Sequence, residues 1–129
     1  MTMVIVDSSV WIGYFKDNAH RETLFSLIDS GSIAINELIL AELIPSIRLK
    51  HEDALEVLLQ TIPTFSIHPD WSEIADIQTA LLKNGINKVG IPDLMILQNA
   101  VQNNAAVFSI DKHMKLAAPF VGCRLLGEK

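Results

Sequence analysis

Short apolar runs alternate along this chain with longer stretches in which apolar residues recur at helical spacing. Apolar, β-branched runs are typical of strands in a sheet that is covered on both faces, and strict alternation also indicates a strand. Five segments are predicted as strands on these grounds, the last of them at an edge: residues 3–6, 33–35, 64–67, 106–110 and 124–126.

The stretches between these runs have the apolar spacing and the end signals of helices. The predicted helices span approximately residues 9–16, 20–30, 36–61 (as two helices), 70–84, 90–103 and 111–116. Pro45 is expected to bend the first helix of the 36–61 pair. Strands that alternate with helices predict an α/β fold, a three-layer α/β/α sandwich around a mainly parallel sheet of four to five strands. We expect a single domain over residues 1–129.

Composition agrees with a globular domain and adds little chemistry. Half of the residues are hydrophobic, and no apolar run approaches the ~20 residues of a membrane span. The N-terminus lacks the features of a signal peptide, so we expect a cytoplasmic protein without membrane contact. Cys123 is the only cysteine, which excludes an internal disulfide, and it is expected to be a small buried residue.

Four acidic residues stand in strongly apolar surroundings. Asp7 and Asp111 directly follow predicted strands, and Glu42 and Asp93 lie in apolar helical segments. An ionised carboxylate among aliphatic side chains is costly unless it is paired, hydrogen-bonded or bound to a metal. Sites in parallel sheets form beyond the carboxyl ends of the strands, and all four acids can reach that edge. If they meet there, a divalent cation would relieve their mutual repulsion.

Net charge supports the same interpretation. The chain has 15 acidic and 10 basic residues, so removing these four acids leaves 11 against 10, nearly neutral. Any contact with nucleic acid must then come from local lysines and a metal rather than from a general basic field. Lys112 and Lys88 would flank the crevice as candidate phosphate contacts, although a solvated lysine is the more common case.

Simpler roles compete for three of the acids. Asp7 and Asp111 could serve only as N-caps of the helices that follow, and Asp93 could be a first-turn acid that suits the helix dipole. Ser9 and Ser109 could be turn residues, or their hydroxyls could support the carboxylates from behind.

Glu42 is harder to explain in this way. We expect it to point towards apolar surroundings with Leu38, Ile39 and Leu49, where an unpaired glutamate is rare. An ion pair with Arg48 or Lys50 is the simple alternative, but offsets of six and eight residues place neither on its helical face.

The segments that carry these acids resemble those of PIN domains. The matching segments are Ile5–Ile12, Leu40–Leu43, Ile91–Ile96 and Ser109–Met114, the last with a hydroxyl residue two positions before its aspartate. Their order and spacing, and the length of the chain, resemble the VapC-type toxins of bacterial and archaeal toxin–antitoxin pairs. Two departures are Pro45, where many relatives continue a regular helix, and the absence of a small-residue helix start before Asp93.

This resemblance implies a metal-dependent endoribonuclease, a hydrolase of RNA phosphodiester bonds. Asp7, Glu42, Asp93 and Asp111 would be the catalytic acids that hold Mg²⁺ or Mn²⁺, with Ser9 as the hydroxyl near the first acid. It also implies an RNA substrate, a small VapB-like antitoxin as partner, and a homodimer.

For the antitoxin we expect an apolar groove built from the helices around Leu38–Leu59, with Trp11 and Phe15 nearby.

Two other functions fit the fold class. A phosphoacceptor receiver domain needs an acid pair after its first strand, whereas Asp7 is followed by two serines. A non-catalytic binding module on the same fold has no need of four acids. Cleavage of RNA with Mn²⁺, tested with and without EDTA, separates an enzyme from a scaffold.

Overall fold

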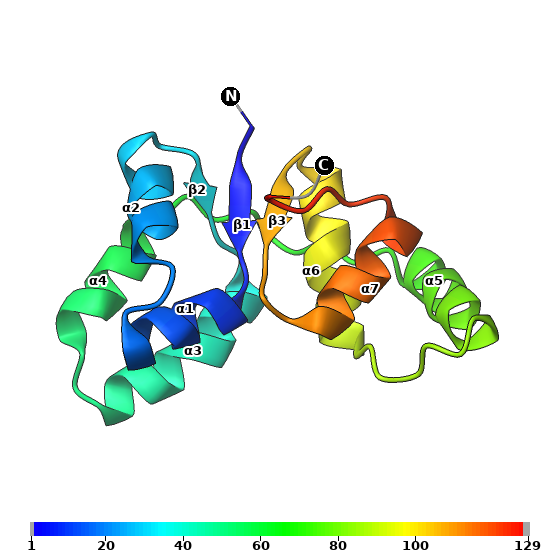
Figure 1. Cartoon of the computed structure of the whole chain (residues 1–129), viewed down its shortest axis with the longest axis horizontal. Coiled ribbons are helices and arrows are strands. Elements are labelled where there is room, and N and C mark those ends of the chain that lie inside the picture. The colour runs from blue at the N-terminus through cyan, green and yellow to red at the C-terminus, as the bar shows by residue number, and fades with distance from the viewer. Residues whose placement is uncertain (1, 128–129) are drawn as a thin grey trace.

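The computed structural model describes residues 2–127 and contains a small parallel sheet flanked by helices (Figure 1). In chain order the elements are β1 (Val4–Val6), α1 (Ser8–Asp17), α2 (Arg21–Asp29), β2 (Ile33–Ala34), α3 (Glu37–Leu49), α4 (Asp53–Thr61), α5 (Trp71–Lys83), α6 (Ile91–Gln102), β3 (Ala106–Phe108) and α7 (Lys112–Val121). The helices α1 to α4 gather on the β2 side of the sheet and α5 to α7 on the β3 side (Figure 1).

The sheet has the order β2-β1-β3, with both pairings parallel. Ile5 pairs with Ala34 on one side and with Val107 on the other. Every residue of β1 is buried, as its uninterrupted apolar sequence predicts for a strand covered on both faces. Because all three strands run the same way, their carboxyl ends lie at one edge of the sheet.

The α/β fold class is confirmed, but the sheet has three strands in the part of the chain that is described, not four to five. Residues 64–67 and 124–126 lie where predicted, yet each makes only one parallel bridge, Ile35 with Thr64 and Val107 with Leu125. In residues 64–67 a side chain takes the place of a neighbouring strand, because Asn99 donates to the backbone carbonyls of Phe65 and Ser66. These carbonyls therefore have partners without a neighbouring strand.

The helices match the predicted segments, with one difference in extent. α7 extends to Val121 rather than to about 116, and Pro119 lies in its last turns. Gly122 ends it in the left-handed conformation, with φ of 78°, and its N–H donates to the Ala118 carbonyl. Pro45 lies inside α3, which continues through it to Leu49.

Apolar side chains from both groups of helices pack around the sheet in one cluster. Cys123 is buried as expected, and burial raises the pKa of its thiol to about 11. Within residues 2–127, no helix is long and apolar enough to span a bilayer.

Candidate active site

Asp7 is the most buried of the four acids, with 4% of its surface exposed. It follows β1 in extended conformation and is the N-cap of α1. Its Oδ2 atom accepts hydrogen bonds from Ser9 Oγ at 2.7 Å and from Ser109 Oγ at 3.1 Å. No partner for Oδ1 is found among residues 2–127, so that oxygen keeps its lone pairs for a ligand.

The two hydroxyls connect Asp7 to the loop after β3. Ser9 Oγ accepts from the Ile110 N–H at 3.3 Å, and Ser109 Oγ accepts from the Asp111 N–H at 3.0 Å. Each hydroxyl has one proton, and each gives it to Asp7. Backbone donors after β3 therefore fix the serines, and the serines fix the carboxylate.

Glu42 lies in α3, close to Asp7 and Asp93. Partial burial raises the pKa of Glu42, and the nearby carboxylates of Asp7 and Asp93 raise it further, while the Ser8 hydroxyl opposes the change. Glu42 is exposed, with Ile12 and Leu43 beside it in one groove, and Leu49, expected on the same face, is 83% exposed. Glu42 therefore borders apolar side chains at the surface and is not buried among them as expected.

Asp93 lies in the first turn of α6 and is half-buried. Burial raises its pKa, and so do the carboxylates of Asp111 and Asp7; the Gly90 backbone and His113 act in the opposite direction. The carboxylates of Asp7 and Asp93 thus lie close enough to Glu42, and those of Asp7 and Asp111 close enough to Asp93, to raise the pKa there. The structure brings all four predicted acids to the carboxyl edge of the sheet.

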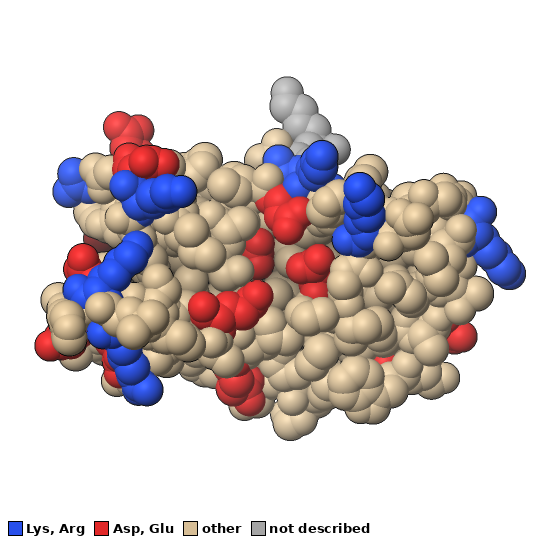
Figure 2. All heavy atoms as spheres, turned by 90° about the horizontal axis from the view of Figure 1, so that it is seen from below, with Lys and Arg blue, Asp and Glu red and all other residues tan. Residues whose placement is uncertain are grey.

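Seen from that edge, acidic side chains gather in a hollow across the middle of the molecule; basic side chains border one end of this group, and others lie towards the periphery (Figure 2). Within residues 2–127 the only ion pair joins Arg48 to Glu56, at 3.0 Å. Arg48 therefore does not neutralise Glu42, and the simple ion-pair explanation with that residue fails.

Asp7 and Asp111 serve as N-caps of α1 and α7, as their simpler roles predict. Asp111 Oδ1 accepts from the His113 N–H at 2.8 Å, and Asp7 accepts weakly from the Ser9 N–H at 3.4 Å. Asp93 is a first-turn acid of α6, as its simpler role predicts, while Gly90 is the N-cap. Capping does not explain why four carboxylates converge with no ion pair to any of them among residues 2–127.

The donor set is made of carboxylate oxygens, the ligands that Mg²⁺ and Mn²⁺ accept. In the described part of the chain, no three His, Cys, Asp or Glu side chains are arranged to coordinate one ion directly. A Mg²⁺ ion usually retains several waters and is held through only one or two carboxylates, so the acidic cluster suits such an ion.

The two candidate lysines are exposed and lie beside this cluster in sequence. Lys112 follows Asp111 at the start of α7, and Lys88 precedes the N-cap of α6 by two residues. Their contact with phosphate remains a prediction.

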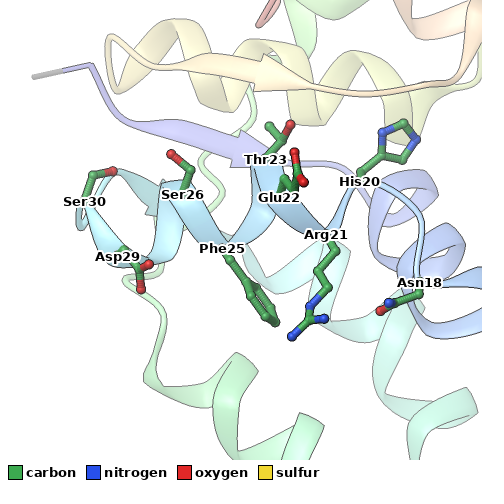
Figure 3. A pocket seen from close by; sticks show the side chains of 9 residues that line it. All are labelled: Asn18, His20, Arg21, Glu22, Thr23, Phe25, Ser26, Asp29 and Ser30. Atoms are coloured by element: carbon green, nitrogen blue, oxygen red, sulfur yellow. The ribbon is translucent and has the colours of Figure 1, made fainter.

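A separate hollow of about 1120 Å³ lies along α2, and none of the predicted site residues lines it. Figure 3 shows its lining, in which the Arg21 guanidinium lies over the Phe25 ring, 4.8 Å from its centre. Its mixed charge and open form give it no evident chemistry.

Two buried asparagines were not recognised from the sequence. Asn36 is the N-cap of α3 and is fully buried, and Asn99 on α6 is 1% exposed. An asparagine directly before a helical pattern is an N-cap signal and could have identified Asn36. Nothing in the sequence indicates that Asn99 is its partner.

Comparison with known proteins gives a family and a fold. The family model described as the PIN domain matches residues 4–118. The fold resembles a DNA-bound VapBC from Salmonella typhimurium, with TM-score 0.75 and 18% identity over 97% of both chains. VapBC2 from Rickettsia felis, bound to a promoter DNA fragment, gives TM-score 0.74 and 17% identity over 96% of this chain and 97% of that one.

A third similar structure is FitAcB from Neisseria gonorrhoeae, with TM-score 0.66 and 20% identity over 95% of this chain and 96% of the other. No curated protein sequence matches the chain.

Proposed function

Because this chain belongs to the PIN domain family, we propose that it is a metal-dependent endoribonuclease and the VapC-type toxin of a toxin–antitoxin pair. The observation that carries the proposal is the convergence of Asp7, Glu42, Asp93 and Asp111, none of which forms an ion pair within residues 2–127. Membership of the PIN family excludes the receiver domain as an alternative.

Hydrolysis of a phosphodiester requires an activated water and stabilisation of charge on the leaving oxygen. A Mg²⁺ or Mn²⁺ ion held by the acids would supply both. Asp7, Asp93 and Asp111 would hold this ion, directly or through water, and Glu42 would hold a second ion or orient the attacking water. Ser9 and Ser109 would fix Asp7 so that its free Oδ1 faces the cation. Lys112 and Lys88 are the proposed contacts with RNA phosphates.

The test is incubation of purified protein with RNA and Mn²⁺, with and without EDTA. We expect fragments that carry a 5′-phosphate and a 3′-hydroxyl, and no cleavage with EDTA. Asp7→Asn should reduce cleavage at least 100-fold while the fold is retained, since removal of a metal-orienting or charge-stabilising group typically costs that much. Asp76→Asn, an exposed acid on α5, is the matched control.

Full Mn²⁺-dependent cleavage by Asp7→Asn would overturn the site. Absence of cleavage by the wild-type protein would favour the non-catalytic binding module.

The proposed antitoxin contact is a groove of about 130 Å³ between α1 and α3, lined by Ile12, Phe15, Glu42, Leu43 and Ser46 with two lysines. Ile12 is 49% exposed there, so an apolar side chain of a partner could cover it. Trp11, expected near this groove, is 1% exposed and lies in the core instead. The groove adjoins Glu42, so a partner in it would also block the acids.

Expression in a bacterial host tests the toxin assignment. Induction of the wild-type chain should arrest growth, and induction of Asp7→Asn should not. Harmless wild-type protein at equal abundance would contradict the assignment. We propose a cytoplasmic location, in keeping with the proposed RNA substrate, and a homodimer, which light scattering of the purified protein would test.

A further inference from the structure

Asn36 and Asn99 form a buried link between the two helices that carry Glu42 and Asp93. Asn36 Nδ2 donates to Asn99 Oδ1 at 3.0 Å. α3 otherwise packs mainly on α1 and α4, while α6 packs on α5, α7 and β3. Among residues 2–127, no other side-chain hydrogen bond joins α3 to α6. The two helices stand on opposite sides of β1 (Figure 1).

Every neighbour of this amide pair fixes its orientation. Asn36 Oδ1 accepts from the Ile39 N–H at 2.9 Å, so its Nδ2 must face Asn99. Asn99 Oδ1 accepts that bond, so its own Nδ2 faces the Phe65 and Ser66 carbonyls. Turning either amide over would place donor against donor or acceptor against acceptor. The link therefore has one geometry, whereas an apolar contact at the same place would have no preferred direction.

Glu42 and Asp93 are separated from the asparagines of this link by the same number of residues. Glu42 follows Asn36 by six residues, and Asp93 precedes Asn99 by six. Six residues of helix correspond to about 9 Å along each axis. The carboxylates of Glu42 and Asp93 repel each other, which pushes α3 and α6 apart, and the buried amide bond opposes that separation.

We propose that the Asn36–Asn99 pair is a positioning device that sets the separation of Glu42 from Asp93. The inference rests on the proposed function in that these two acids would hold the catalytic cation. Neither asparagine touches substrate or cation; both act through the helices to which they belong.

The test uses Asn36→Ser in the full chain. Serine is as good an N-cap as asparagine, so α3 still begins correctly, but its side chain is too short to reach Asn99. Gln98→Ala is the matched control, because Gln98 is a buried residue of the same helix whose hydrogen bonds go to Asp70 and Glu73 and not to α3. Asn36→Asp, which keeps the cap but sets an acceptor against Asn99 Oδ1, is the second variant if the serine variant is poorly folded.

Two measurements separate positioning from general stability. Mn²⁺ affinity, by calorimetry, should fall about 10-fold in Asn36→Ser and remain unchanged in Gln98→Ala. In RNA cleavage, the Mn²⁺ concentration for half-maximal rate should rise by the same factor, while the rate at saturating Mn²⁺ changes little. Equal losses in Gln98→Ala, or wild-type affinity in Asn36→Ser, would overturn the proposal.

The distance between α3 and α6, measured without metal, tests the Asn36–Asn99 link even if the proposed function fails. Spin labels at Leu49→Cys on α3 and Val101→Cys on α6, both exposed, would be placed in a Cys123→Ser background. We expect a narrow distribution in the parent, a broader or longer one with Asn36→Ser, and no change with Gln98→Ala. An unchanged distribution in Asn36→Ser overturns the link. Wild-type protein that binds no Mn²⁺ refutes the proposed function alone.

Discussion

Glu42 and Asp93 show how converging carboxylates can weaken the fold that carries them. Both carboxyl pKa values are raised by burial and by neighbouring carboxylates. The folded state then holds its protons more tightly than the unfolded state does. Its stability falls as pH rises through the interval from the ordinary values, 4.5 for Glu42 and 3.8 for Asp93, to the raised ones. Above that interval the full penalty is present.

Removing either charge should therefore stabilise the metal-free protein. We expect Glu42→Gln and Asp93→Asn to be more stable than wild type at neutral pH in EDTA, and the difference should vanish in acid. Urea unfolding from about pH 3 to about pH 8 measures this. Asp76→Asn, far from the cluster, should track the wild type. Variants that lose stability at neutral pH would contradict the repulsion described here.

Ser109 supports two acids at once, since it donates to Asp7 and accepts from the Asp111 N–H. Ser109→Ala should lower the free energy of unfolding by about 1–3 kcal/mol, because two partly buried groups lose a hydrogen bond. It should also reduce RNA cleavage. Ser109→Thr retains the hydroxyl and should behave nearly as wild type. Ser72→Ala, at an exposed position of α5, controls for loss of a hydroxyl.

At the scale of elements, the sequence predicts helices better than strands. Helical periodicity and caps are local, so Asp70 is the N-cap of α5, where the predicted helix over 70–84 begins. Pairing of residues 64–67 depends instead on Asn99, which is distant in sequence and binds the Phe65 and Ser66 carbonyls. No local pattern reveals such a partner, and this explains why the sheet was predicted too large.

The N-cap of α5 allows a test of the claim that local residues determine where a helix begins. Asp70 accepts from the Glu73 N–H at 3.1 Å. Asp70→Ala should lower the free energy of unfolding by about 1 kcal/mol, and Asp70→Asn should change it little, because asparagine caps as well as aspartate. Thermal or urea unfolding measures both, with Asp76→Ala as the uncapped-position control. Equal losses in Asp70→Ala and Asp76→Ala would show that charge, not capping, matters at this end of the helix.

For the molecule as a whole, the acids were recognisable in sequence because each lies at an element boundary or in an apolar segment. Their convergence follows from topology: parallel strands end at one edge, and Asp7 and Asp111 follow two paired strands. The surroundings of Glu42 could not be predicted in the same way, because the buried face of α3, with Ile39, Leu43 and Ile47, leaves it at the surface. Which face is covered depends on packing, not on the helix alone.

The last prediction concerns the balance of charge over the whole chain. In this chain of net charge −5, the proposed divalent cation would bind the folded state, in which the four acids converge, and not the unfolded one. At 100 times its dissociation constant such an ion adds about 2.7 kcal/mol of stability, which corresponds to several degrees in melting temperature. We expect Mn²⁺ to raise the melting temperature of wild-type protein and to leave that of Asp7→Asn almost unchanged. NaCl at matched ionic strength should reproduce little of the effect, since screening acts on all charges. An equal rise with NaCl, or in Asp7→Asn, would mean that the acids share no bound cation and only repel one another.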